Sequence, residues 1–331
     1  RRYNMRLFKL LFIILIPFLL IANDDRPPID YDFLAKQEVK NFINMMVKKH
    51  NFDRKYVTDT LRHAKLDRDT LARYTGKYKV GSTNGPWERY KAHVLDPISL
   101  DKAKKFKKNY YKTLKRAEKT YNIDMNYIIG FMGVESKFGE YTGDYNILDA
   151  LATLAFHPNR MQKFFKSEFK HLFLLSREKE YKITQLEGSF AGAMGCVQQV
   201  PSVARTHKSD FNHDGITDPW NLVDCIGSIA TFMHKNKWRK GHVVAVPTSF
   251  KGKRFTKLKT SHKRTLSTKT IYKVGIKPLK PFNESTAYLL KTRNTTHDDI
   301  YIGGKNFRVL TRYNNSTSYG VAIHLIAQSV K

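Results

Sequence analysis

The carboxylate of Glu135 is the first candidate in this sequence for acid–base chemistry. It lies near the end of an apolar segment, Ile128 to Gly139, whose final glycine predicts the end of a helix. Burial beside Phe131 and Met132, together with the negative end of the helix dipole, disfavours a charged carboxylate and predicts a raised pKa. A carboxyl group that keeps its proton near neutral pH can act as a general acid. The alternative is an ordinary exposed glutamate in the last turn of a helix.

A second segment, Glu187 to Ser202, is dense in small residues. Small side chains let a ligand or another helix approach the backbone closely, and Ser189 and Gln198 could form hydrogen bonds with sugar hydroxyls or amides. The segment lacks the lysine of a phosphate-binding loop. Taken alone, its composition favours tight helix packing over ligand binding.

Oxygen-bearing side chains alternate in a third segment and are followed by Gly215, as in the first half of an EF-hand calcium loop. The twelfth position of the loop holds Asn221 instead of glutamate, so a carboxylate three residues later would have to close it. The alternative is an acidic loop without metal. We predict a structural Ca²⁺ site and no organic cofactor, with these ligands: Asp210, Asn212, Asp214, Ile216 and Asp224.

The composition narrows the class of partner. The chain has 331 residues, 41% of them hydrophobic, and a net charge of +30. This content is too apolar for a disordered tail, and the charge favours polyanionic surroundings such as nucleic acid, anionic lipid or an acidic cell-wall polymer. No helix-turn-helix, zinc or RNA-binding signature is present, so nucleic acid is not expected.

The N-terminal residues 1–22 predict export. A short basic head, Met5 to Lys9, precedes an apolar run from Leu10 to Ala22, which is the pattern of a signal peptide. The run is short for a membrane span, but the cleavage site is poor, so an uncleaved anchor remains an alternative. We expect a periplasmic protein, soluble or anchored to a membrane by this segment, and a monomer.

Hydrophobic periodicity predicts a mainly α (α+β) fold. We expect a helical N-terminal domain at 23–85, a catalytic core at 86–240, a small β-rich domain at 241–308 and a returning C-terminal helical segment at 309–331. Within these, Lys102 to Lys119 predicts one basic amphipathic helix with Phe106, Tyr110, Tyr111 and Leu114 inward. Thr270 to Val274 predicts a strand.

Several motifs, taken together and in this order, resemble the lytic murein transglycosylases of the B type. They are Gly133-Val134-Glu135, Ile147 to Leu154, Gly188 to Gly195, the Asp210 loop, Gly227-Ser228, and Thr311 to Thr317. The resemblance spans about Phe42 to Val330. It implies a lysozyme-like core and cleavage of peptidoglycan between MurNAc and GlcNAc, with a 1,6-anhydro-MurNAc end as product.

The resemblance also implies roles for individual residues. Glu135 matches the family's catalytic acid and base, and one carboxylate suffices because the sugar's own 6-hydroxyl, rather than water, attacks the anomeric carbon. Hydrolytic glycosidases normally need two carboxylates. Positions that bind substrate or orient the acid are Tyr90, Arg160, Ser189, Gln198, Phe232, Tyr313 and Asn314. Phe232 stands where the family has a tyrosine, which removes a hydroxyl from the cleft. An inactive peptidoglycan-binding protein with the same cleft is the alternative function.

Cys196 and Cys225 are the only cysteines. In an oxidising compartment an even number allows pairing, and a bridge would tie the acidic loop to the small-residue segment. Spacing alone cannot show that the two residues are close, so the sequence favours two buried free thiols over a disulfide.

Overall fold

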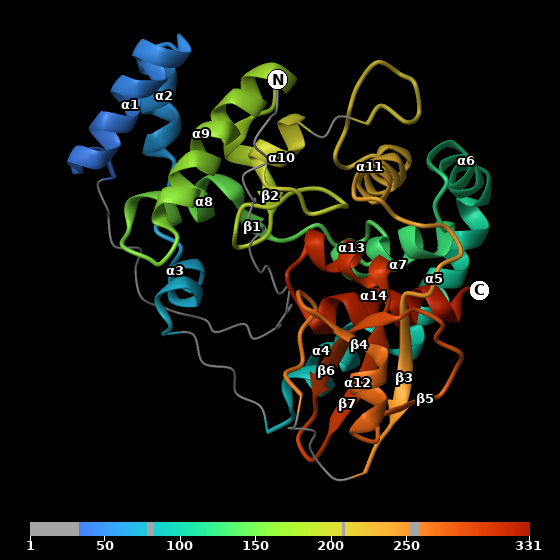
Figure 1. Cartoon of the computed structure of the whole chain (residues 1–331). Coiled ribbons are helices and arrows are strands. Elements are labelled where there is room, and N and C mark those ends of the chain that lie inside the picture. Colours follow the sequence, from blue (N-terminus) through green and yellow to red (C-terminus); the bar gives the residue numbers. More distant parts are fainter. Residues whose placement is uncertain (1–32, 78–82, 207–208, 252–257) are drawn as a thin grey trace, which may run out of the picture.

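The computed structural model describes residues 33–77, 83–206, 209–251 and 258–331. The predicted export segment at residues 1–22 lies outside these ranges. The described part is mostly helical and carries one small antiparallel sheet, in agreement with the predicted fold class (Figure 1). None of its helices combines the length and the apolar character that crossing a bilayer requires.

A first group of helices forms the upper left of Figure 1. Buried aromatic rings hold the group together, with Phe42 of the first helix 5.0 Å from Phe169 and 5.7 Å from Phe156 between ring centroids. Aspartates start two of the helices: Asp53 accepts from the backbone N–H of Tyr56 and Asp67 from that of Thr70. The group consists of α1 (Gln37–His50), α2 (Arg54–Arg62), α3 (Arg68–Thr75), α8 (Ile147–Phe156) and α9 (Gln162–Lys179).

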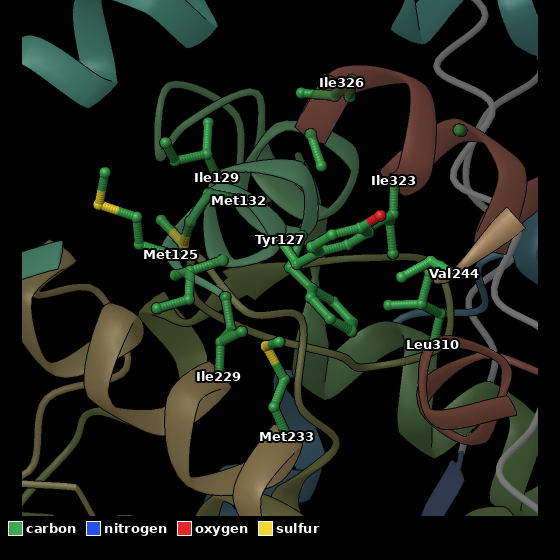
Figure 2. Packing of buried hydrophobic residues seen from close by; sticks show 14 of the residues in the cluster. Met125, Tyr127, Ile129, Met132, Ile229, Met233, Val244, Leu310, Ile323 and Ile326 are labelled. Atoms are coloured by element: carbon green, nitrogen blue, oxygen red, sulfur yellow. The ribbon is translucent and has the colours of Figure 1, made fainter. Parts of the chain in front are cut away.

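A second group of helices surrounds the segment that carries Glu135. Its core is drawn in Figure 2, where Met132 of α7, Ile229 and Met233 of α11, and Ile323 of α14 meet. The two groups are not continuous in sequence. Helices α8 and α9 follow α7 along the chain but pack in the first group. The second group consists of α4 (Pro86–Val94), α5 (Pro97–Asn109), α6 (Tyr111–Tyr121), α7 (Met125–Ser136), α11 (Leu222–Lys235), α13 (Lys305–Tyr313) and α14 (Thr317–Ser329).

Helices α7 and α14 lie in close contact because α7 carries glycines on the shared face. A Cβ atom on Gly130 would stand 2.5 Å from the carbonyl oxygen of Ile323, and one on Gly133 would stand 3.1 Å from Ile326 Cδ1. Only glycine allows this approach of the two backbones at Gly130. The C-terminal helix is therefore packed directly against the helix that bears Glu135.

The sheet is an insertion between α11 and α13. Its strands are β3 (Ala245–Ser249), β4 (Thr265–Ser267), β5 (Lys277–Pro278), β6 (Thr286–Arg293) and β7 (Asp298–Gly303), in the order β4-β6-β7-β3-β5 with antiparallel neighbours. Leu290 pairs with Tyr301 in the register of the two longest strands. Two shorter strands, β1 (Tyr145–Asn146) and β2 (Glu187–Gly188), pair elsewhere, and α10 (Pro201–Thr206) follows them.

The predicted strand at Thr270 to Val274 is wrong. These residues lie mainly in helix α12 (Thr268–Lys273). Thr268 and Ile271 are buried and the residues between them are exposed, which is the three-residue spacing of a helical turn and not the alternation of a strand.

The single helix predicted from Lys102 to Lys119 is also wrong. The chain turns at Tyr110, which ends α5 and precedes α6. The turn lets Phe106 of α5 pack 5.5 Å from Phe138 between ring centroids, while α6 contacts α11 and Leu114 is buried. Tyr111, predicted to face inward, is 47% exposed because it lies at this corner.

Candidate active site

Glu135 lies in the last turn of α7. The helix ends at Ser136, three residues before the glycine expected to end it, because Lys137 and Phe138 already adopt left-handed backbone angles (φ 49° and 66°). The backbone N–H of Phe138 donates to the carbonyl of Met132 at 2.9 Å, which closes the helix end. The carboxyl group is thus fixed at a rigid helix terminus.

Burial sets the protonation state of Glu135. Its side chain is 8% exposed, and burial raises its pKa to about 8. The hydroxyl of Tyr319 donates a hydrogen bond to Oε1 of Glu135, which favours the ionised form and limits this rise. No second carboxylate in the described chain contributes to the shift. Glu135 therefore stands as a single, protonated acid at neutral pH.

Three tyrosines from distant parts of the chain surround this acid. Tyr90 comes from α4, Tyr313 from the end of α13 and Tyr319 from the first turn of α14. Burial, and then the proximity of Glu135, raise the pKa of each phenol, so all three remain neutral hydrogen-bond donors. The rings of Tyr313 and Tyr319 are nearly parallel, with centroids 6.5 Å apart.

Tyr319 is not among the site residues predicted from the sequence. It lies in an apolar run, where a tyrosine reads as one more core residue. Its hydroxyl nevertheless needs a partner once it is buried, because a phenol in an apolar interior is costly when it makes no hydrogen bond. That need was the one available signal, and the sequence could not identify Glu135 as the partner.

The small-residue segment forms a turn-rich loop rather than the packed helix that its composition favours. The hydroxyl of Ser189 accepts from the backbone N–H groups of Ala191 and Ala193, at 3.3 and 3.1 Å. Gln198 has a left-handed backbone (φ 47°), and its Nε2 donates to the carbonyls of Thr142 and Gly195. Its Oε1 is buried and accepts no hydrogen bond from the described residues.

The hydroxyl of Tyr313 ties this loop to the three tyrosines by donating to the carbonyl of Val197. Phe232 supports Tyr313 from α11, with ring centroids 4.8 Å apart and the planes nearly perpendicular. Asn314 follows Tyr313 and is buried. Of these residues, Tyr313 lies beside Glu135, and Phe232 and the Gln198 loop contact Tyr313. Arg160 does not share their contacts: it is exposed after α8, with its guanidinium 5.5 Å from the ring of Tyr74.

Cys196 and Cys225 form a disulfide, so the preference for two free thiols is wrong. Their Cα atoms are 6.2 Å apart although 29 positions separate them in sequence. The chain between them folds back on itself: the N–H of Cys196 donates to the carbonyl of Pro219 at 2.9 Å, and Asn221 then caps the start of α11. The bridge joins the loop of Gln198 to the helix of Phe232.

In the predicted calcium loop, Asp210 to Asp224, the carboxylates accept hydrogen bonds from backbone N–H groups of the loop itself. Asp210 accepts from the N–H groups of Asp214 and Gly215, and Asp214 accepts from that of Ile216. Asp224 is buried and accepts from three backbone N–H groups of the surrounding chain. In the part of the chain that the structure describes, no three Asp, Glu, His or Cys side chains form a cluster able to hold a metal. The oxygen chemistry of the loop nevertheless suits a hard cation.

Comparison with known proteins gives consistent matches. Residues 34–328 match the family model described as the transglycosylase SLT domain. The chain is 34% identical over 306 residues to the membrane-bound lytic murein transglycosylase B of Escherichia coli (strain K12), covering 90% of this chain and 84% of that protein.

Solved structures agree with this match. The Escherichia coli lytic transglycosylase Slt35 in complex with bulgecin A has 33% identity and a TM-score of 0.83, covering 93% of this chain and 97% of that one. Its complex with calcium has the same identity and coverage, with a TM-score of 0.81. SltB1 from Pseudomonas aeruginosa has 26% identity and a TM-score of 0.75, covering 88% and 98%.

Replacing Tyr319 by phenylalanine tests the hydrogen bond to Glu135. The hydroxyl stabilises the ionised carboxylate, so its loss should raise the pKa of Glu135 further, by roughly one unit. A carbon-13 NMR titration of the glutamate carboxyl, in Tyr319→Phe and in wild type, measures this. The control is Tyr272→Phe, at an exposed tyrosine of α12. An unchanged or lowered pKa in Tyr319→Phe would show that the contact does not set the acidity.

Proposed function

The chain belongs to the transglycosylase SLT domain family, and we propose that Glu135 is the residue through which it acts. It is a peptidoglycan lytic transglycosylase, which cleaves the β-1,4 bond between MurNAc and GlcNAc and leaves a 1,6-anhydro-MurNAc end. The observation that carries the role of Glu135 is its state at neutral pH: a buried carboxylic acid with a pKa of about 8 and no carboxylate partner among the described residues.

One carboxyl group can serve both halves of this reaction. Glu135 donates its proton to the glycosidic oxygen, the bond from that oxygen to the anomeric carbon breaks, and GlcNAc leaves as an alcohol. The 6-hydroxyl of the same MurNAc then attacks the anomeric carbon, and the carboxylate of Glu135 accepts the proton that this hydroxyl loses. The acid is regenerated and no water is consumed.

The surrounding groups fit these two steps. Tyr319 donates to Glu135 and would stabilise the carboxylate formed after the first proton transfer. The substrate's N-acetyl carbonyl can stabilise the positive charge at the anomeric carbon, which replaces the second carboxylate of hydrolytic glycosidases. Burial excludes water that would otherwise compete with the 6-hydroxyl.

The remaining cleft residues are proposed to bind the glycan. Tyr90 is proposed to offer its ring and hydroxyl to a sugar, and Tyr313, whose hydroxyl donates to Val197, to offer part of its ring. The buried Oε1 of Gln198 offers an acceptor for a sugar hydroxyl or an N-acetyl N–H, since no described residue uses it. Ser189, Phe232 and Asn314 shape the cleft. Arg160 would bind a more distant part of the substrate.

An inactive binding protein is not favoured. Binding alone gains nothing from a carboxyl group that burial keeps protonated, and burying an ionisable group costs free energy. Proton transfer, by contrast, needs a pKa near the working pH. The basic charge of the chain fits the anionic cell wall without invoking nucleic acid.

We propose a periplasmic location, with membrane association through the N-terminal segment. The disulfide between Cys196 and Cys225 supports an oxidising compartment. The Escherichia coli relative is described as membrane-bound and acts on murein. We propose that the protein acts as a monomer.

Calcium is proposed as a structural ion of the acidic loop. One relative of known structure is in complex with calcium. Asp210, Asn212 and Asp214 would hold the ion through side-chain oxygens and Ile216 through its carbonyl. Asp224 would complete the set after giving up backbone hydrogen bonds that it now accepts from Phe211 and Asn212. Bound calcium would supply rigidity to the loop that leads into α11.

Glu135→Gln should abolish turnover, lowering the release of anhydro-muropeptides from sacculi by at least about a hundredfold, because an amide cannot donate the proton. It should also change the pH dependence of stability. In wild type the unfolded carboxyl ionises at lower pH than the native one, so stability falls as pH rises from about 4.5 to about 8. The variant lacks this loss and should become the more stable protein towards pH 8.

Mass spectrometry of the released muropeptides and thermal unfolding at several pH values measure the two effects. Glu180→Gln, at an exposed glutamate after α9, is the matched control and should resemble wild type in both. Near-normal release by Glu135→Gln would exclude Glu135 as the acid.

Calcium should raise the melting temperature of wild type, because an ion that binds only the native state stabilises it by mass action. The double variant Asp210→Ala, Asp214→Ala should not respond. Asp101→Ala, which removes an exposed carboxylate of α5, should respond as wild type does. Differential scanning calorimetry with calcium or with a chelator measures this. An equal response of wild type and the double variant would contradict the proposed site.

A further inference from the structure

A histidine of the β-rich insertion contacts the segment from which α14 starts. His262 is half-buried and lies in the chain that leads into β4. Its Nε2 is 2.8 Å from Oδ1 of Asn315, and its Nδ1 is 3.0 Å from Oγ1 of Thr317. Asn315 belongs to the connection between α13 and α14, and Thr317 is the first residue of α14. The imidazole therefore spans the start of the helix, two residues before Tyr319.

Each ring nitrogen of His262 has a defined role in these two hydrogen bonds. Burial lowers the pKa of His262, and the hydrogen bond with Asn315 offsets part of this effect. The charges of Arg308 and Lys263 lower it further, so the ring is neutral at neutral pH. The amide oxygen of Asn315 can only accept, so Nε2 carries the ring proton and donates it. Nδ1 is then the acceptor for the hydroxyl of Thr317.

The backbone that carries the imidazole is fixed to the sheet. The N–H of Ser261 donates to the carbonyl of Leu289 in β6 at 2.7 Å. The hydroxyl of Ser261 accepts from the N–H of Lys263 at 3.0 Å, which closes a turn around His262. Strand β4 starts at Thr265 and pairs with β6, and β6 in turn contacts α14 (Figure 1). The histidine is thus held by a turn that is anchored at both ends.

The segment that His262 contacts determines where Tyr319 lies. Residues 314–316 join α13 to α14, and the backbone is extended at Asn314 and Ser316 (ψ 125° and 134°). The hydroxyl of Ser316 caps α14 by accepting from the N–H of Tyr319 at 3.3 Å. The phenol of Tyr319 in turn donates to Oε1 of Glu135. A shift of this short connection would therefore move the phenol relative to the carboxyl group.

We propose that His262 is a positioning residue for the reaction: it fixes the start of α14 so that the hydroxyl of Tyr319 donates to Glu135. The inference rests on the proposed role of Glu135 as the acid and base. His262 acts through the tyrosine and not by contact with the substrate. The β-rich insertion thereby gains a part in the reaction, because it supplies the imidazole and the turn that holds it.

The pKa of Glu135 in His262→Ala tests this proposal by the direction of its change. Loss of the imidazole releases the start of α14, so the hydrogen bond from Tyr319 weakens and the pKa should rise above about 8, by up to roughly one unit. A general loosening of the structure would do the opposite, because water would reach the carboxyl group and lower its pKa. Carbon-13 NMR titration of the glutamate carboxyl measures the direction. The basic limb of the pH profile of kcat/KM should move upwards with it.

Three further variants make the assignment specific. His262→Gln keeps one donor and one acceptor at the end of the side chain and should leave the pKa of Glu135 close to that of wild type. Thr317→Val removes the hydroxyl that donates to Nδ1 but keeps the histidine and its turn, so it should raise the pKa even if His262→Ala fails to fold. His242→Ala, at an exposed histidine before β3, is the matched control and should leave the pKa unchanged.

The double variant His262→Ala, Tyr319→Phe shows whether the histidine acts through the tyrosine. Once the hydroxyl of Tyr319 is absent, removal of the imidazole should change the pKa of Glu135 no further. An unchanged or lowered pKa in either His262→Ala or Thr317→Val, or shifts that add in the double variant, would overturn the proposal. Failure of the transglycosylase assignment is distinguishable, because wild type would then release no anhydro product, whereas the titration of Glu135 does not require turnover.

Discussion

The close contact of α7 with α14 is the constraint on which the active site depends. Gly130 lets the backbone of α7 approach the carbonyl of Ile323, and Tyr319, in the first turn of α14, donates to the carboxyl group of Glu135. Burial raises the pKa of Glu135, and the hydrogen bond from Tyr319 limits the rise. Acidity near neutral pH is therefore a product of helix packing. The C-terminal helix can contribute because the chain returns to the core after the β-rich insertion.

The Gln198 loop is fixed by covalent and polar contacts with segments distant in sequence. The disulfide joins the Gln198 loop to α11, the hydroxyl of Tyr313 binds the carbonyl of Val197 in the same loop, and Phe232 of α11 supports the ring of Tyr313. Each contact limits the freedom of a different chain segment. Gln198 lies in this loop with a left-handed backbone, φ 47°.

The sequence was sufficient for features with a local cause. The helical segments around Phe42 and Glu135 follow from apolar periodicity, and the order of short motifs identified the family. The two wrong secondary-structure predictions arose where packing overrides the local pattern. Thr270 to Val274 contains β-branched residues typical of strands, but burial of Ile271 with Thr268 three residues before it favours one helical turn. The turn at Tyr110 depends on packing against other helices, which the amphipathic pattern does not contain.

Features that depend on contacts between residues distant in sequence could not be predicted. Nothing near Cys196 in sequence indicates that Cys225 will lie 6.2 Å away between Cα atoms, because the intervening loop must first fold back on Pro219. Tyr319 reads as a core residue until α14 is placed against α7.

We propose that one buried carboxylic acid, Glu135, performs both proton transfers and that water is not the nucleophile. Digestion of sacculi in oxygen-18-labelled water, followed by mass spectrometry of the products, tests it directly. Attack by the 6-hydroxyl should give anhydro-MurNAc ends that carry no oxygen-18 and weigh one water less than hydrolysed ends. Reducing MurNAc ends labelled with oxygen-18 would contradict it, because they would show that water attacks the anomeric carbon.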